Sequence, residues 1–226
     1  MYGNSASLAP VNIFTPSGLM NLGYDSLSPM HALWLLDPDT RTHSYRVAHI
    51  AEKMGTGLGL DGTTIDDLKK AGLLHDVGKI AVQSIVLKLG KLTVEEQDGI
   101  IWHPIYSGII LSKNPRFSTP PITRAAEEHH ERNDGGGYPF GKRGDEISLG
   151  GKILSICDGF EAATSRIPMR NYNHLRSGDG HPLTVDDFRQ VVMADNGKEY
   201  DPEIAGVFIE RVLGDREFLR TLCLDV

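Results

Sequence analysis

Cysteine is scarce in this chain of 226 residues, which contains only Cys157 and Cys223, far apart and outside any CxxC pattern. Two such residues argue against a disulfide framework. They are typical of a reducing cytosol, where each acts as a small, partly buried apolar residue, so we expect a cytoplasmic protein. The sequence also lacks any run of 18 apolar residues, which predicts no membrane span. The N-terminus shows no secretory signal.

Blocks of basic residues are missing as well. The chain has 23 Lys and Arg against 30 Asp and Glu, a formal net charge of −7. This balance argues against a general DNA or RNA binder, because such proteins need a basic surface. It would also repel a phosphate substrate. Bound cations would remove that repulsion, and the nine histidines of the chain are candidate ligands for them.

The alternation typical of β-strands is scarce, and from residue 31 onward the apolar residues recur mostly at helical spacing. Capping patterns and prolines indicate where helices begin. We expect helices over the following segments: Asp39 to Met54, Thr64 to about Ile80, a start at Thr93, Pro120 through His130, 151 to 164, a start at Thr184, and a last helix from Asp201.

The predicted fold class is therefore all-α, a helical bundle over residues 31–226. Residues 1–30 are rich in Ser, Asn, Pro and Gly and are interpreted as an N-terminal arm or the remnant of a linker. The glycine-rich segment 135–141 is the main irregular feature of the second half. It forms either a loop or a short β-hairpin.

Three polar side chains share one face of the segment LLHDVGKI. Lys79 lies four residues after His75 and three after Asp76, so the three point the same way on a helix. Imidazole and carboxylate are good ligands for divalent metals. A solvent-exposed polar face is the alternative, and the adjoining Gly-Lys favours a metal and phosphate site.

Further candidate ligands follow the same pattern along the chain. His43 has Asp39 four residues earlier, and His103 precedes a proline. The stretch HHERNDGGGYP contains a histidine pair, and Asp158 interrupts an apolar run. The candidate ligands are His43, His75, Asp76, His103, His129, His130 and Asp158. One ion takes only about four to six ligands, so this set indicates at least two metals, with Asp76 as a bridge and Asp39 available for a third.

These motifs resemble the HD-GYP domain family, the bacterial signalling branch of the HD phosphohydrolases that degrades cyclic di-GMP. The resemblance rests on HDxGK at 75–79, HP at 103–104, HHExxDGxGYP at 129–139 and the acid at 158, and it covers about residues 31–213. It implies an HD-type helical bundle whose seven metal ligands are the candidates named above. Asp76 would bridge the ions and Lys79 would contact a substrate phosphate.

The resemblance also implies substrate and partner contacts. The loop from Gly135 to Pro139 would shape the rim of the site, with Gly135, Gly137 and Tyr138 near the substrate, and would contact diguanylate cyclase (GGDEF) domains. Tyr138 either stacks on a guanine or packs the loop. Arg170 would bind substrate. The implied cofactors are two or three divalent ions, iron or manganese first, with nickel or zinc as the alternatives.

One segment departs from the family pattern. Where the family usually has DALTSxRPYR after the acid, this chain has EAATSRIPMR. Ile167 stands where the first arginine is expected and Met169 replaces the tyrosine, while Arg170 keeps its place. A phosphate clamp is therefore missing or displaced, which affects cyclic di-GMP binding more than the metal chemistry.

The expected activity is hydrolysis of cyclic di-GMP to linear pGpG, GMP or both, through attack of a hydroxide that bridges the ions, with Asp76 and Lys79 as catalytic residues. A regulatory module of the same fold with weak or no turnover is the alternative. An HD hydrolase of another phosphate ester is a third reading, which the GYP loop disfavours. A homodimer, and a fragment of a larger sensor protein, both remain open.

Overall fold

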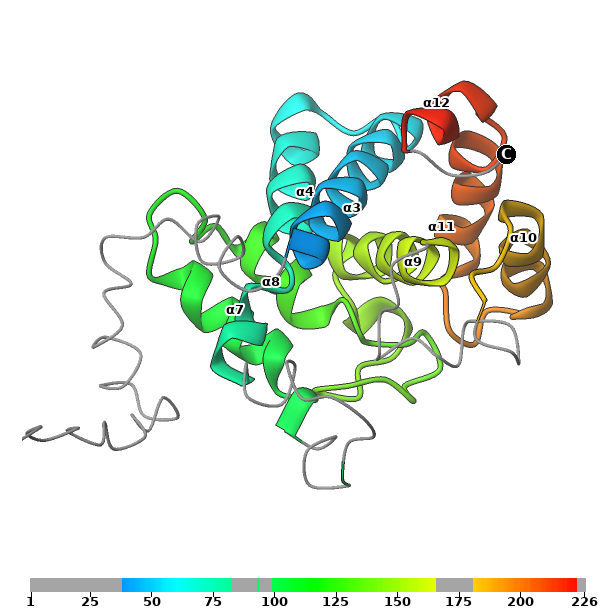
Figure 1. Cartoon of the computed structure of the whole chain (residues 1–226). Coiled ribbons are helices and arrows are strands. Elements are labelled where there is room, and N and C mark those ends of the chain that lie inside the picture. The colour runs from blue at the N-terminus through cyan, green and yellow to red at the C-terminus, as the bar shows by residue number, and fades with distance from the viewer. Residues whose placement is uncertain (1–37, 83–92, 94–98, 166–180, 223–226) are drawn as a thin grey trace, which may run out of the picture.

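The computed structural model describes residues 38–82, 93, 99–165 and 181–222, and among these it contains helices and loops but no strand (Figure 1). Three short helical segments, two of the 3₁₀ type and one π-helical turn, accompany the α-helices: η1 (Val77–Val82), η2 (Gly144–Glu146) and η4 (Phe208–Val212). The α-helices are α3 (Pro38–Gly57), α4 (Gly62–Leu74), α7 (His103–Ser112), α8 (Pro120–Glu128), α9 (Leu149–Thr164), α10 (Val185–Ala194), α11 (Pro202–Val207) and α12 (Arg216–Thr221).

Helix α9 runs through the middle of the bundle (Figure 1). It packs against α3, α4, α8, α10 and α11, and α7 packs in turn on α8 and η1. Nearly every residue from Gly151 to Thr164 is buried, as expected for a mostly apolar helix at the centre of a bundle. Its start is fixed by Ser148, whose side chain accepts a hydrogen bond from the Gly151 N–H. The prediction of an all-α HD-type bundle is confirmed.

The ends of α4 differ from the prediction. The helix begins at Gly62 because Asp61, not Thr64, is its N-cap and accepts from the N–H groups of Thr63 and Thr64. It ends at Leu74, whereas the sequence predicted a helix to about Ile80. The chain turns at the HD pair and continues as the buried 3₁₀ segment η1.

Other boundaries were closer. The capping box of Thr184 and Asp187 precedes α10, and Pro120 opens α8, both as predicted. Helix α8 ends at Glu128, so His129 caps it and His130 lies beyond it. The helix expected as the last one comprises α11 and η4 and is followed by α12.

The remaining predictions concern the glycine-rich segment, the N-terminal arm, the helix start at residue 93 and membrane spans. The glycine-rich segment contains no strand, so it is a loop and not a hairpin. The predicted arm at residues 1–30 lies outside the described residues. The helix predicted to start at Thr93 continues into residues 94–98, which also lie outside them. No helix among the described residues is long and apolar enough to cross a membrane.

Candidate metal centre

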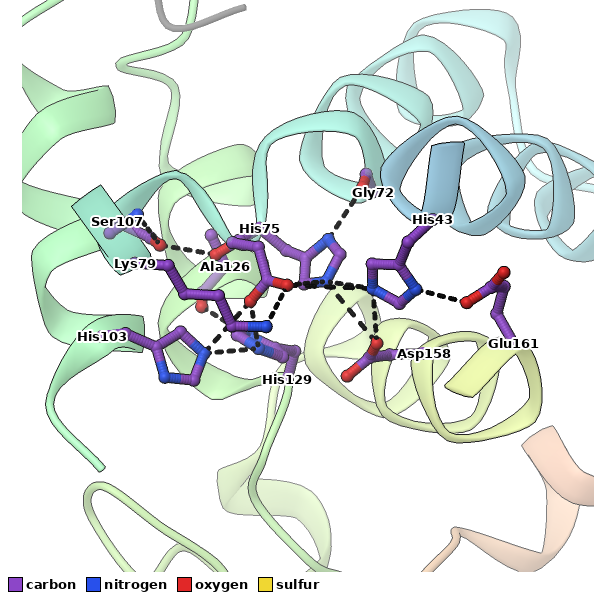
Figure 2. Close-up of polar contacts among 12 residues, drawn as sticks. His43, Gly72, His75, Lys79, His103, Ser107, Ala126, His129, Asp158 and Glu161 are labelled. Carbon is purple, nitrogen blue, oxygen red and sulfur yellow. Dashed lines mark hydrogen bonds and ion pairs between the residues drawn. The ribbon is translucent and has the colours of Figure 1, made fainter. Parts of the chain in front are cut away.

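Five helices and the turn after α4 deliver one buried polar cluster to the middle of the bundle (Figure 2). Six of the seven predicted ligands in it are at most 2% exposed, while His130 is half-buried. The positions of the ligands are His43 on α3, His75 at the C-cap of α4, Asp76 in the turn, His103 at the start of α7, His129 and His130 at the end of α8, and Asp158 on α9.

Three of these imidazoles are held in the same way. Nδ1 of His75 lies 2.8 Å from the Gly72 carbonyl, Nδ1 of His103 lies 2.7 Å from that of Ile100, and Nδ1 of His129 lies 2.7 Å from that of Ala126. A carbonyl oxygen only accepts, so each Nδ1 carries the proton. The lone pair of each neutral ring is therefore on Nε2, which points into the cluster (Figure 2).

The Nε2 atoms face one another. Those of His43 and His75 are 3.3 Å apart, and those of His103 and His129 are 3.4 Å apart. Two lone pairs at this distance repel unless a proton or a cation lies between them. The cluster is thus arranged around positive charge that the rings themselves lack when neutral.

The two carboxyl oxygens of Asp76 face different histidine pairs. Oδ2 lies 3.4 Å from His75 Nε2 and 3.8 Å from His43 Nε2. Oδ1 lies 3.2 Å from His103 Nε2 and 3.9 Å from His129 Nε2. Oδ1 is also buried without a well-directed hydrogen bond. A carboxylate so placed can bridge two ions.

Among the residues that the structure describes, three sets of ligand atoms, each set within 4.8 Å, can hold a metal ion. We call His43, His75 and Asp158 the His43 group, and His103, His129 and His130 the His130 group. The third set, His75, Asp76 and His129, joins them. Nitrogen and carboxylate donors without sulfur fit divalent cations such as iron, manganese, nickel and zinc.

Burial and neighbouring charges shift the pKa values of these imidazoles in opposite directions. Burial lowers the pKa of His43, but the carboxylates of Glu161 and Asp158 outweigh it and raise the pKa to about 9. At His75 burial is likewise outweighed by Asp76 and Asp158, and the pKa rises to about 10. Burial lowers the pKa of His129 to about 3, helped by the charges of His75 and His103. Without a metal, protons on His43 and His75 offset the buried acids.

Metal binding should therefore release protons. The raised pKa values of His43 and His75 mean that protonation stabilises the ion-free fold below pH 6.5, and this contribution is lost as pH rises through 9 to 10. A metal must displace those protons, so its affinity should increase with pH up to that range. Calorimetric titration of ion-free protein with Mn²⁺ at pH 7.5, in two buffers of different ionisation enthalpy, should show release of about one to two protons. Metal binding without any proton release would contradict the assignment of His43 and His75 as metal ligands.

The HD turn is clamped to α7. Ser107 Oγ donates to the His75 carbonyl at 2.5 Å and accepts from the Gly78 N–H at 2.8 Å. A Cβ on Gly78 would lie 2.0 Å from the carbonyl oxygen of His103, so only glycine allows this approach. The next residue, Lys79, is buried and its ammonium pairs with Asp76 Oδ2.

The glycine-rich loop covers the half-buried side of the cluster. Gly135 has φ 81°, while Gly137 is required by space, since its Cβ would lie 2.4 Å from the Arg132 nitrogen. The Tyr138 ring stacks on the His130 ring with centroids 4.7 Å apart, and its N–H donates to the His130 carbonyl at 3.1 Å. Tyr138 thus packs the loop against a candidate ligand.

Two acids hold this loop. Glu131 accepts from the N–H groups of Phe140 at 2.7 Å and Lys142 at 2.9 Å. Asp134 accepts from the Gly136 N–H at 2.8 Å and pairs with Arg132. Both carboxylates are therefore engaged in fixing the turns of the glycine-rich loop.

Sequence reasoning missed Glu161, which is buried and lies 2.5 Å from His43 Nδ1. The available signal was a second acid three residues after Asp158 in an apolar helix. Four residues singled out in the sequence are not placed with the cluster. Asp39 belongs to α3, but its side chain lies outside the description, and Ile167, Met169 and Arg170 lie outside the described residues altogether.

The helical bundle and its buried His/Asp cluster define a class of protein that sequence comparison also identifies. A family model described as "HD domain" matches residues 28–178, so the chain belongs to the HD-domain family. It is 34% identical over 173 residues to the 3'3'-cGAMP-specific phosphodiesterase 2 of Vibrio cholerae, covering 76% of this chain and 31% of the relative. It is 33% identical over 179 residues to a cyclic di-GMP phosphodiesterase of Thermotoga maritima, covering 77% and 45%.

A solved structure has the same fold. The crystal structure of a cyclic GMP-AMP specific phosphodiesterase of Vibrio cholerae aligns with TM-score 0.59 at 18% identity, covering 86% of this chain and 48% of that one. These matches confirm the resemblance to the HD-GYP phosphodiesterases. The chain spans less than half the length of the curated relatives named here.

Proposed function

We propose that the chain is a metal-dependent phosphodiesterase of cyclic dinucleotides. The main observation in support is the pair of histidine groups whose Nε2 lone pairs face inward on either side of Asp76. Such an arrangement is costly for an empty helical core and suited to two ions. The names of the relatives favour the substrate class, since one is called a cyclic di-GMP phosphodiesterase and another is specific for 3'3'-cGAMP.

The proposed ligands are the His43 group, the His130 group and the bridging Asp76, with Asp39 available to complete a third site. Two or three ions would be held, iron or manganese by preference. When bound, such ions lower the pKa of water toward about 7 and neutralise charge on a phosphate. They also supply the positive field that a chain of net charge −7 lacks.

The chain's own residues would bind and orient the substrate. Lys79 is the cation nearest the cluster in the described structure, and its ammonium would donate to phosphoryl oxygens. Since six ligands are buried and His130 and Tyr138 are only half-buried, the substrate would enter from the side of the glycine loop. Gly135, Gly137 and Tyr138 would form its rim, and Arg170 would add a phosphate contact.

Within this class we propose cyclic di-GMP as the substrate, cleaved to pGpG, GMP or both. The glycine loop would also carry any contact with a GGDEF domain. A regulatory module with little turnover is the second candidate, favoured by Ile167 and Met169 in place of the family's arginine and tyrosine. The same segment would tune the choice between cyclic di-GMP and 3'3'-cGAMP.

The test is a substrate comparison without oxygen. Protein loaded with iron, and separately with manganese, is incubated with cyclic di-GMP and with 3'3'-cGAMP, and the products are resolved by chromatography. We expect hydrolysis, faster for cyclic di-GMP, and the product distribution shows how far cleavage runs. Metal occupancy without any product from either dinucleotide would reject the enzyme and favour the regulatory module.

A further inference from the structure

The four inward-facing histidines do not share one kind of support. His75, His103 and His129 each donate their Nδ1–H to a backbone carbonyl three residues earlier. His43 instead places Nδ1 2.5 Å from Oε2 of Glu161, a carboxylate that is 1% exposed (Figure 2). One imidazole of the cluster therefore has an anionic partner where the others have a neutral dipole.

The two histidine groups also differ in their own charge. The His43 group includes the carboxylate of Asp158, whose Oδ1 lies 3.0 Å from His43 Nε2. The His130 group consists of imidazoles alone, and the set that joins it to its neighbour brings one carboxylate, Asp76. A carboxylate that accepts the Nδ1–H of a ligating histidine fixes the ring and makes Nε2 a stronger donor. Both differences act in the same direction.

We propose that Glu161 is a positioning residue that makes the His43 group the tighter of the two metal-binding halves. The inference rests on the proposed metal centre and adds an order of loading to it. The first ion binds at the His43 group and is retained, while the ion at the His130 group exchanges more readily. The exchangeable ion then lies on the half-buried side, next to the glycine loop.

Glu161 is well placed for this role because both of its oxygens are engaged. Oε2 contacts His43, and Oε1 lies 3.1 Å from Nη1 of Arg46, which also reaches Ser165 Oγ at 3.4 Å. Arg46 is 20% exposed and offsets part of the carboxylate charge. Arg46 makes it possible to distinguish a charge effect of Glu161 on the metal from a purely structural effect. It belongs to the same hydrogen-bond network as Glu161 but has the opposite charge.

The order of loading is tested with Mn²⁺ as the probe. Wild-type protein, His43→Ala and His103→Ala are loaded, dialysed against rising concentrations of a chelator, and analysed for manganese per chain. We expect His103→Ala to keep one tightly held ion at chelator concentrations that strip His43→Ala. Equal retention by the two variants, or the reverse order, would overturn the proposal.

The role of Glu161 is tested in the same assay. Glu161→Gln keeps a hydrogen-bond acceptor but loses the charge. It should lower the affinity for the tightly held ion about 10- to 100-fold. Arg46→Met removes the opposing charge and should hold that ion at least as tightly as the wild type. Asp201→Asn, which alters a half-buried acid outside the cluster, is the control and should change nothing. Circular dichroism checks the fold of each variant.

The outcomes distinguish a failure of the proposal for Glu161 from a failure of the proposed metal centre. If Glu161→Gln retains manganese like the wild type, the proposal fails while the metal centre stands. If Arg46→Met loses the ion as Glu161→Gln does, Glu161 is only a structural link, and the proposal fails as well. If the wild type itself binds no manganese, the proposed function fails first.

Discussion

Replacing Asp76 with asparagine should lower the turnover of cyclic dinucleotide about a thousandfold. An amide has the shape of the carboxylate but cannot supply an anionic oxygen to each side, and Oδ1 and Oδ2 face different histidine pairs. Metal ions contribute several kcal/mol to stabilising charge in such reactions, and each 1.36 kcal/mol corresponds to a tenfold change in rate. The measurement is single-turnover cleavage together with ions per chain, which should fall to one or fewer.

The fold of Asp76→Asn must be shown to survive, because Lys79 loses its buried partner. Near-ultraviolet circular dichroism of the variant should match that of ion-free wild-type protein. Lys79→Met gives the comparison on the other side of the pair. It should reduce turnover while leaving the ions per chain unchanged. Wild-type rates in Asp76→Asn with full metal occupancy would sink the bridging role.

Replacing Gly78 with alanine should have the largest effect on stability. The new Cβ would lie 2.0 Å from the His103 carbonyl oxygen and 2.4 Å from the Ser107 nitrogen. These are backbone atoms of α7, so no side-chain movement relieves the clash. We expect a loss of roughly 3 kcal/mol in the free energy of unfolding, at the upper end for overpacking. The same displacement would separate the HD pair from His103 and reduce metal retention.

Gly206 supplies the matched control for this substitution. It is an exposed glycine within α11, and a Cβ there meets nothing within 4 Å. Gly206→Ala should raise stability by about 0.5–1 kcal/mol, because alanine restricts the unfolded chain and favours helix. Urea unfolding of both variants measures the difference. Equal stability of the two would show that η1 and α7 do not meet as described.

The sequence predicted the residues of the cluster better than the means by which they are held. Asp158 and the histidine pair stood out because polar groups interrupt apolar runs, and burial requires partners for them. The end of α4 at Leu74 was not predictable from its own apolar pattern, which continues past the HD pair. The chain leaves the helix there because Ser107, a residue of a distant segment, binds the His75 carbonyl and the Gly78 N–H.

Tertiary contact also explains the other misses. Glu161 follows Asp158 in a helix, but its link to His43 joins residues that are 118 positions apart. The glycine loop contains turn residues that fit a hairpin as well as a loop. It forms no strand because the N–H groups of Phe140 and Lys142 are taken by one carboxylate, Glu131, and not by a facing strand. In both cases the partner lies outside the local sequence pattern, even where, as at Glu161, the acid itself stands out.

The most direct test of the account is the metal content of the wild-type chain. The protein is purified without oxygen and without chelators, and iron, manganese, nickel and zinc are counted per chain by elemental analysis. The account predicts two or three ions per chain, matching two histidine groups joined by Asp76. Less than one ion per chain, unchanged after incubation with each metal in turn, would contradict the central claim that this cluster is a metal centre.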